Sequence, residues 1–166
     1  MNDLNGFDVD ELSGESRDLA KHKEKCQVSR TLRAEWKGGA RARVYSPDGK
    51  ELFVGGEGEF GAMSVALASL LACEIDVLAT NATLRGIELE TLTVEGTGEF
   101  NYARYMNAAK EPAPGYQGIS YTVRIKSKKA SKEQLAELTR LCETASPVGD
   151  TFSRRVPLKL DVIVEP

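Results

Sequence analysis

The segment SLLACEIDVL, residues 69–78, sets one cysteine among leucines and alanines in the most apolar part of the chain. Apolar side chains cover most of the circumference of the helix that the sequence predicts over residues 62–85. Arg85 is favourable in its last turn, and Gly86 is typical of the residue that ends a helix. We therefore expect a core helix that is buried on several sides, which in a small domain suggests a dimer interface.

Two carboxylates near the middle of this segment, Glu74 and Asp76, argue against a membrane span, because ionised side chains are costly inside a bilayer. The chain opens on an acidic stretch that lacks the apolar region of a secretory signal. Of the 166 residues, 41% are hydrophobic and 28% are charged, and the formal net charge is -3. This composition is typical of a soluble globular protein. We expect a cytoplasmic protein whose main partner is neither a nucleic acid nor a membrane.

Before the apolar helix, the sequence predicts a polar helical extension over residues 1–25 and then three short strands. Apolar residues recur at alternate positions from Val28 to Trp36, and the turns KGG and PDGK separate this strand from ARARVYS and ELFV. These strands form an antiparallel meander. The segment GGEGEFGA lacks the lysine and the Ser/Thr of a phosphate loop, so we interpret it as a flexible entry into the helix.

After the apolar helix, the sequence predicts two strands, a second helix and a last strand. The predicted elements are strand 87–96, loop 101–118, strand 119–126, helix 131–143 and strand 156–164. A change of register in the first of these strands predicts a bulge near Thr91. Ser131 and Gln134 form a capping box at the start of the second helix. The order of elements and the hairpins predict an α+β fold in a single domain over residues 1–166.

Cysteine and histidine are sparse in this chain. The three cysteines, Cys26, Cys73 and Cys142, are an odd number at wide spacing, which is not the pattern of a disulfide framework. The single histidine, His22, lies in the charged run KHKEK, which we interpret as a solvated helix face. A zinc site made from Cys and His is therefore not expected, and we predict neither a metal nor another cofactor.

The sequence around Cys73 gives this thiol no local activation. A reactive thiol needs a lowered pKa, which a helix N-terminus or a nearby cation supplies. Cys73 lies about three turns into its predicted helix, and Asp76 on the same face would raise the pKa of the thiol if it were ionised nearby. Local sequence thus favours a buried structural cysteine, and any activating cation has to come from elsewhere in the fold.

Three segments in order resemble the OsmC/Ohr family of small bacterial thiol-dependent proteins: ALASLLACEIDVLATNATLRGIELETLTVEG, GYQGISYTVRIK and ASPVGDTFSRRVPLKLDV. The segments NGFDVDEL and EWKGGARARV are similar to a branch of OsmC-like proteins with an extra N-terminal helix. The resemblance implies antiparallel sheets wrapped around two central helices in an intertwined homodimer. It also implies two sites at the dimer interface, where peroxidase members reduce organic hydroperoxides.

The resemblance further implies roles for individual residues. In peroxidase members a cysteine of the central helix attacks the peroxide, and an arginine from the N-terminal strands lowers its pKa. Cys73 falls on the cysteine position, and Arg43, or failing that Arg41, falls where the arginine is expected. A glutamate ahead of the helix holds that arginine in the family. Met63 occupies the glutamate position here, so that Glu59, or Glu57 beside it, could substitute only if the loop folds back.

The second cysteine of the family, which resolves the sulfenic acid as a disulfide, has no direct counterpart. Ser146 occupies its position just before Pro-Val, and a serine cannot form a disulfide. Cys142 lies one helical turn earlier on an apolar stripe, where we interpret it as a core residue. Cys26 is interpreted as structural as well.

Two functions remain open on the sequence. The first is a peroxide-response protein in which Cys73 is a one-cysteine thiol peroxidase for organic hydroperoxides and needs an external thiol as reductant. The second is a non-redox homodimer that binds a small apolar ligand at its interface, with Cys73 inert. A guanidinium close to the sulfur favours the first function, and a sulfur enclosed by Leu, Val and Ala favours the second.

Overall fold

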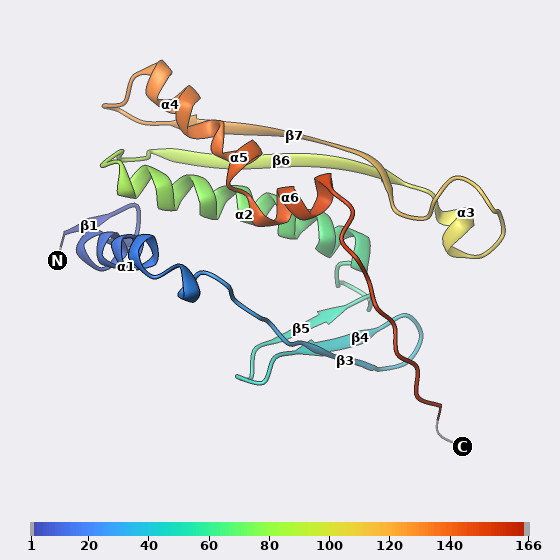
Figure 1. Cartoon of the computed structure of the whole chain (residues 1–166). Coiled ribbons are helices and arrows are strands. Elements are labelled where there is room, and N and C mark those ends of the chain that lie inside the picture. Colours follow the sequence, from blue (N-terminus) through green and yellow to red (C-terminus); the bar gives the residue numbers. More distant parts are fainter. Residues whose placement is uncertain (1, 165–166) are drawn as a thin grey trace.

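The computed structural model describes residues 2–164, and residue 1 and residues 165–166 lie outside this range. Its central element is the helix α2 (Ala62–Leu84), along which the antiparallel ribbon of β6 (Thr91–Phe100) and β7 (Tyr116–Lys126) runs, as Figure 1 shows. Gly96 allows this close approach, because a Cβ atom built on it would lie 2.8 Å from Cδ2 of Leu71 on the helix. Helices and antiparallel strands together confirm the predicted α+β class.

Three short helices continue the chain after the ribbon. They are α4 (Lys132–Thr139), α5 (Leu141–Thr144) and α6 (Pro147–Ser153). The capping box of Ser131 and Gln134 is confirmed, since each side chain bonds the other residue's backbone N–H. The core lies between these helices, α2 and the ribbon, and its buried members are Leu78, Ala82, Ile87, Leu138 and Cys142.

The N-terminal extension closes the far end of α2. It consists of β1 (Asp3–Leu4), β2 (Phe7–Asp8), α1 (Val9–Lys21) and a 3-10 turn (Lys23–Lys25). Asp8 caps α1 through bonds from the N–H groups of Asp10 and Glu11. In the turn before it, the side chain of Asn5 donates to the carbonyl of Ile87 over 2.9 Å and accepts from the N–H of Leu89 over 2.9 Å. The extension is therefore attached to the segment that follows α2.

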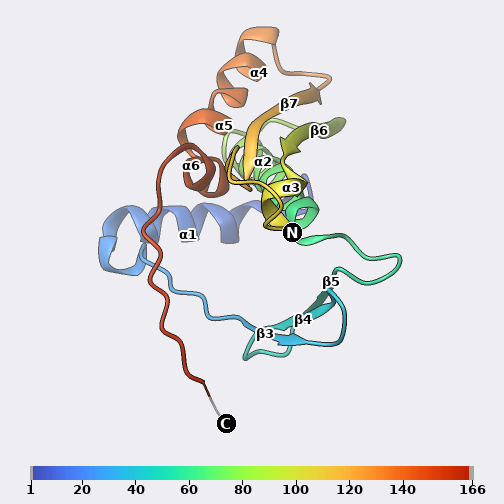
Figure 2. The ribbon, with the colours of Figure 1, turned by 90° about the vertical axis from the view of Figure 1, so that its right-hand side faces the viewer.

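A second sheet consists of β3 (Arg33–Trp36), β4 (Ala42–Tyr45) and β5 (Glu51–Val54). It lies apart from α2 in both cartoon views of the chain (Figures 1 and 2). Its order is the predicted antiparallel meander, β3-β4-β5. Several large apolar side chains of this sheet and of the loop after it face solvent, including Trp36, which is 77% exposed, and Phe60, which is 70% exposed. No second layer formed by residues 2–164 covers this sheet (Figure 2).

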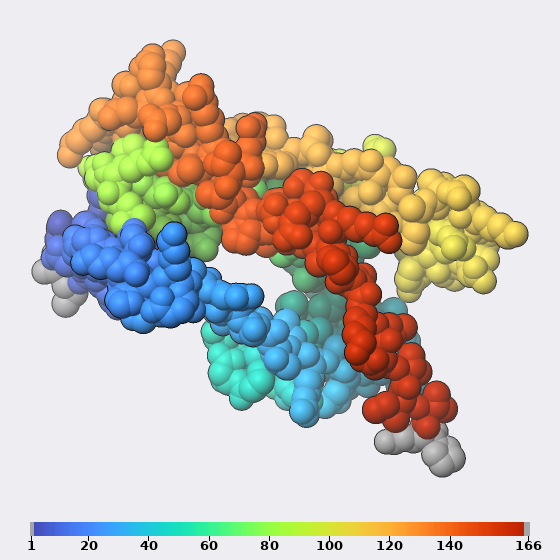
Figure 3. Space-filling view, in the orientation of Figure 1, coloured from blue at the N-terminus to red at the C-terminus, as the bar shows by residue number. Residues whose placement is uncertain are grey.

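The C-terminal segment corrects the prediction of a last strand over 156–164. The chain is extended there but has no strand partner, and it runs away from the body of the molecule (Figures 1 and 3). Leu158 is 94% exposed and Leu160 is 84% exposed. The alternation of apolar residues is real, but a strand also needs a partner, and no strand within residues 2–164 pairs with this segment.

Two strand starts, the position of a bulge and one loop also differ from the sequence prediction. The first strand begins at Arg33 rather than near Val28, and the ribbon begins at Thr91 rather than at residue 87. The bulge predicted near Thr91 is wrong, because the register shifts between Glu99 and Phe100 instead. A short helix, α3 (Tyr102–Tyr105), interrupts the loop that follows. For the strands and the bulge, alternation alone did not show where the partner strand stops.

Burial of α2 is also narrower than expected. The buried stripe repeats every four residues, at Leu70, Glu74, Leu78 and Ala82. Thr83 beside this stripe is buried as well, the rest of the helix is exposed or half-buried, and Ile75 is 40% exposed. The prediction of burial on several sides is therefore wrong for the single chain. By length and composition alone α2 could cross a membrane, but in the fold its stripe packs as a core helix does.

Candidate functional site

The closing segment of the chain brings Ser146 against Cys73. Ser146 is the N-cap of α6, is 4% exposed, and accepts a hydrogen bond from the N–H of Gly149 over 3.0 Å. Pro147 at the first helical position favours this start. The hydroxyl of Ser146 donates to Sγ of the half-buried Cys73, at 3.4 Å. The residue that the resemblance places at the resolving position is thus in contact with the residue that it places at the reactive position.

Cys142 faces a different environment. It is buried in α5 and belongs to the core, as its apolar stripe predicted. Burial first, and then the neighbouring carboxylate of Glu74, raise the pKa of the Cys142 thiol to about 12. Near neutral pH this sulfur is therefore an uncharged thiol, which is a poor nucleophile.

Glu74 is the polar residue of this region that sequence reasoning did not single out as part of a site. Its side chain is 0% exposed, and within residues 2–164 neither carboxylate oxygen has a hydrogen-bond partner. It lies one turn after Leu70 and one turn before Leu78 on the buried stripe. A carboxylate at a core position of a helix was the signal that could have identified it, because such groups are rarely buried without a partner.

An arginine–glutamate pair lies at the entrance to α2, with Arg41 directly before β4 and Glu59 in the loop after β5. Nε and Nη2 of Arg41 donate to Oε1 of Glu59 over 2.9 and 2.7 Å, and Oε2 of Glu59 accepts from the N–H of Gly56 over 2.9 Å. The hydrogen bonds from Arg41 hold the pKa of Glu59 below its usual range. The loop before α2 thus brings Glu59 to Arg41, and the role of Glu59 in place of the family's glutamate stays a prediction.

Arg43 has other partners. It bonds Glu51 on the neighbouring strand, lies 3.9 Å from the carboxylate of Glu35, and stacks over the ring of Tyr45. Within residues 2–164 of one chain, neither Arg43 nor Arg41 is hydrogen-bonded to Cys73. Arg43 lies in β4 and Arg41 directly precedes it, and the sheet that contains β4 lies apart from α2 (Figure 2). The role of either arginine beside the thiol stays a prediction.

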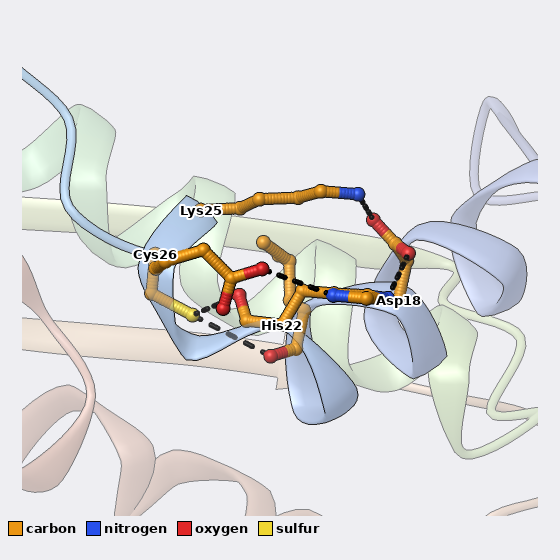
Figure 4. A network of polar contacts seen from close by, with 6 residues as sticks. Asp18, His22, Lys25 and Cys26 are labelled. Atoms are coloured by element: carbon orange, nitrogen blue, oxygen red, sulfur yellow. Dashed lines mark hydrogen bonds and ion pairs between the residues drawn. The ribbon is translucent and has the colours of Figure 1, made fainter.

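The remaining cysteine and the histidine lie at the end of α1 (Figure 4). The ring of His22 lies 3.0 Å from a carboxylate oxygen of Glu24 and 3.6 Å from one of Asp18, and all three are solvent-accessible. Exposure of His22 confirms the solvated helix face. The exposed thiol of Cys26 faces the backbone carbonyls of Leu19 and His22. Among residues 2–164, no group of three His, Cys, Asp or Glu side chains is arranged to hold a metal ion.

Comparison with known structures shows the fold of this chain in several bacterial proteins. An OsmC-like protein from Mycoplasma pneumoniae matches with a TM-score of 0.63 at 17% identity, covering 76% of this chain and 89% of that one. An OsmC-like protein of Vibrio cholerae matches with a TM-score of 0.58 at 12% identity, covering 75% of this chain and 94% of that one.

A third structure is that of an organic hydroperoxide resistance protein, OsmC, from Legionella pneumophila. It matches with a TM-score of 0.53 at 16% identity, covering 75% of this chain and 89% of that one. Comparison of the sequence with curated proteins found no match. The model of the OsmC-like protein family matches residues 55–161, which include α2, the ribbon and the contact between Cys73 and Ser146. The chain therefore belongs to the OsmC-like protein family.

Proposed function

We propose that this protein acts in the response to peroxides as a one-cysteine thiol peroxidase that reduces organic hydroperoxides through Cys73. The observation that carries the proposal is the contact of 3.4 Å between the Ser146 hydroxyl and the Cys73 sulfur. The contact fixes the side chain of Ser146 against the sulfur that is proposed to react, with its hydroxyl as a hydrogen-bond donor. Family membership and the name of the Legionella pneumophila structure support the same substrate class.

The chemistry requires one sulfur and an external reductant. The Cys73 thiolate attacks the terminal oxygen of the hydroperoxide, the O–O bond breaks, and the alkoxide leaves and takes up a proton as the alcohol. Cys73 is then a sulfenic acid. An external thiol attacks that sulfur and releases water, and a second thiol reduces the mixed disulfide to restore Cys73. Ser146 cannot resolve the intermediate, and the uncharged Cys142 thiol is a poor candidate.

A cation for the thiolate would come with a second copy of the chain. In a homodimer, the sheet of β3, β4 and β5 from one copy would cover α2 of the other, and the 156–164 segments would find strand partners. The large apolar side chains exposed on this sheet and tail are the surfaces that such an exchange would bury. Arg41, already held by Glu59, is then the arginine best placed to approach Cys73, ahead of Arg43 with its two carboxylate partners.

The direct test is peptide mass mapping after one equivalent of an organic hydroperoxide, with and without a dimedone-type trap for sulfenic acids. The expected product is a trapped adduct on Cys73 that added thiol prevents, with Cys142 unmodified. Cys73→Ser should abolish the adduct, and Cys26→Ser, which removes an exposed thiol that faces the carbonyls of Leu19 and His22, should leave it unchanged. A stoichiometric disulfide between Cys73 and Cys142 would replace this proposal with a two-cysteine mechanism. Absence of any modification would favour the non-redox binding protein.

A further inference from the structure

One cavity of this chain lies beside α2 but is not lined by Cys73. Its volume is about 500 Å³, which is within the usual range for a small-molecule site. The start of β7, the helices α5 and α6 and one residue of α2 form its walls. Three of its lining side chains are aromatic, namely Tyr116, Tyr121 and Phe152.

Of the described residues, the only charged side chain that lines this cavity is negative. Glu143 lines it, is exposed, and forms no ion pair with any residue in the range 2–164. No Lys, Arg or His is among the lining residues. Aromatic faces attract cations through their quadrupole, so rings and carboxylate favour the same kind of ligand.

The buried carboxylate of Glu74 lies directly behind the cavity wall. Leu70, which lines the cavity, is one helical turn before Glu74 on the same face of α2. Gly149 also lines it, and a Cβ atom built on this glycine would lie 3.3 Å from Oε1 of Glu74. The third neighbour in the wall is Cys142, whose thiol pKa the Glu74 carboxylate helps to raise. Residues that line the cavity therefore lie next to Glu74 on three elements, α2, α5 and α6.

This arrangement leaves Glu74 without a strong donor. Both of its oxygens lack a hydrogen-bond partner within residues 2–164, and a thiol is only a weak donor. A buried carboxylate without a cation or strong donors is costly, and a bound group that supplied them would remove that cost.

We propose that this cavity binds a small organic cation, a primary ammonium with an aromatic or apolar body, whose nitrogen is received by Glu74 while the rings hold its body. The side chain of Cys142 rotates aside to let the ammonium reach the carboxylate, and Glu143 stabilises the charge at the entrance. The inference rests on the cavity and on Glu74 alone, so it holds whether or not Cys73 reacts with peroxides.

The test is calorimetric titration of the full-length protein, under reducing conditions, with three probes of one shape. They are 2-phenylethylamine, the neutral 2-phenylethanol and the anionic 3-phenylpropionate. The amine should bind at least about tenfold more tightly than the alcohol, as expected for a charge-assisted hydrogen bond in a buried site. The carboxylate probe should not bind. The result should be the same in Cys73→Ser, which separates this site from the peroxidase proposal.

Three Glu→Gln variants test which carboxylate binds the ammonium group of the amine. Glu74→Gln should bring the preference for the amine over the alcohol down to about threefold or less, while Glu143→Gln should weaken amine binding only in part. Glu133→Gln makes the same change of net charge on an exposed residue of α4 outside the cavity and should change nothing.

Two further results bear on the pocket itself. If Glu74→Gln does not fold, Cys142→Ala provides the second test, because clearing the path to Glu74 should tighten binding of the amine and not of the alcohol. Equal binding of amine and alcohol, an unchanged preference in Glu74→Gln, or no binding of any probe would overturn the proposal.

Discussion

Ser146 and Cys73, which are 73 positions apart in the chain, are joined by a contact of 3.4 Å between hydroxyl and sulfur. A sulfur atom in place of that hydroxyl would be in contact with Sγ, and the two side chains would have to move closer to reach the disulfide bond length of about 2.05 Å. Ser146→Cys should therefore convert the site into a two-cysteine site. We expect peroxide treatment to give a disulfide between residues 73 and 146, seen by non-reducing peptide mapping. Thr144→Cys, at an exposed position of the preceding helix, should give no disulfide with Cys73. The same result for both variants would contradict the contact between Ser146 and Cys73.

Arg41 and Arg43 provide a matched pair for testing which cation activates the thiol. Arg41 is held by Glu59, whereas Arg43 bonds Glu51. We expect Arg41→Ala to slow the oxidation of Cys73 by an organic hydroperoxide by roughly tenfold, about 1.4 kcal/mol of transition-state stabilisation. Glu59→Gln should act in the same direction, because it releases the guanidinium. Stopped-flow recording of hydroperoxide consumption gives the oxidation rate of Arg41→Ala, Arg43→Ala and Glu59→Gln beside the parent protein. A slower rate in Arg43→Ala with Arg41→Ala unchanged would reverse the assignment.

Cys142 should be inert to alkylation near neutral pH. With its pKa raised to about 12, almost no thiolate is present at about pH 8, whereas the exposed Cys26 should react readily. Mass mapping after brief iodoacetamide treatment of the folded protein measures this directly. Rapid labelling of Cys142 under these conditions would show that the thiol is not held uncharged.

The same shift makes a prediction for stability against pH. The folded-state pKa is raised above the unfolded value of about 8.5, so the contribution of Cys142 is fully present below about pH 8.5 and is lost as the pH rises towards about 12. Cys142→Val should remove that part of the alkaline loss. Urea unfolding at about pH 8 and about pH 10.5 should show a smaller decrease for the variant than for the parent. Equal decreases would argue against the shift.

Asn5 should be important for the stability of the N-terminal extension. Its side chain bonds Thr83, the carbonyl of Ile87 and the N–H of Leu89, and its backbone has a positive φ of 53°. Asn107 has a positive φ of 55° as well, but its exposed side chain makes none of these bonds, so Asn107→Ala controls for backbone strain. We expect Asn5→Ala to lower the free energy of unfolding by about 1–3 kcal/mol more than Asn107→Ala, measured with urea. Equal effects would mean that the bonds of Asn5 add little.

Features set by local hydrogen bonds were predictable from the sequence. The capping box at Ser131 and the end of α2 before Gly86 each depend on a few consecutive residues. The ends of the strands were harder to predict, because they depend on partner segments that are distant in the sequence. The ribbon begins at Thr91, for example, because Lys126 pairs with that residue.

The candidate site shows the same division. The family pattern placed Cys73 and Ser146, and the fold brings them together. It did not show that Arg41 rather than Arg43 holds Glu59, because both arginines lie on one short segment and only the path of the glycine-rich loop distinguishes them. Glu74 was missed as a site residue because its surroundings come from α5 and α6, far along the chain.

The last residues of the described chain also affect how the protein resists aggregation. An unpaired extended segment with apolar side chains is a template for β-aggregation. In 156–164 the leucines and valines alternate with Lys159 and Asp161, which pair with each other over 3.1 Å. These charges act as gatekeepers, because stacking identical copies of the segment in register would place like charges beside one another. Replacing both with serine would leave the apolar face unchanged and remove this protection, so that freshly synthesised chains would precipitate at lower concentrations.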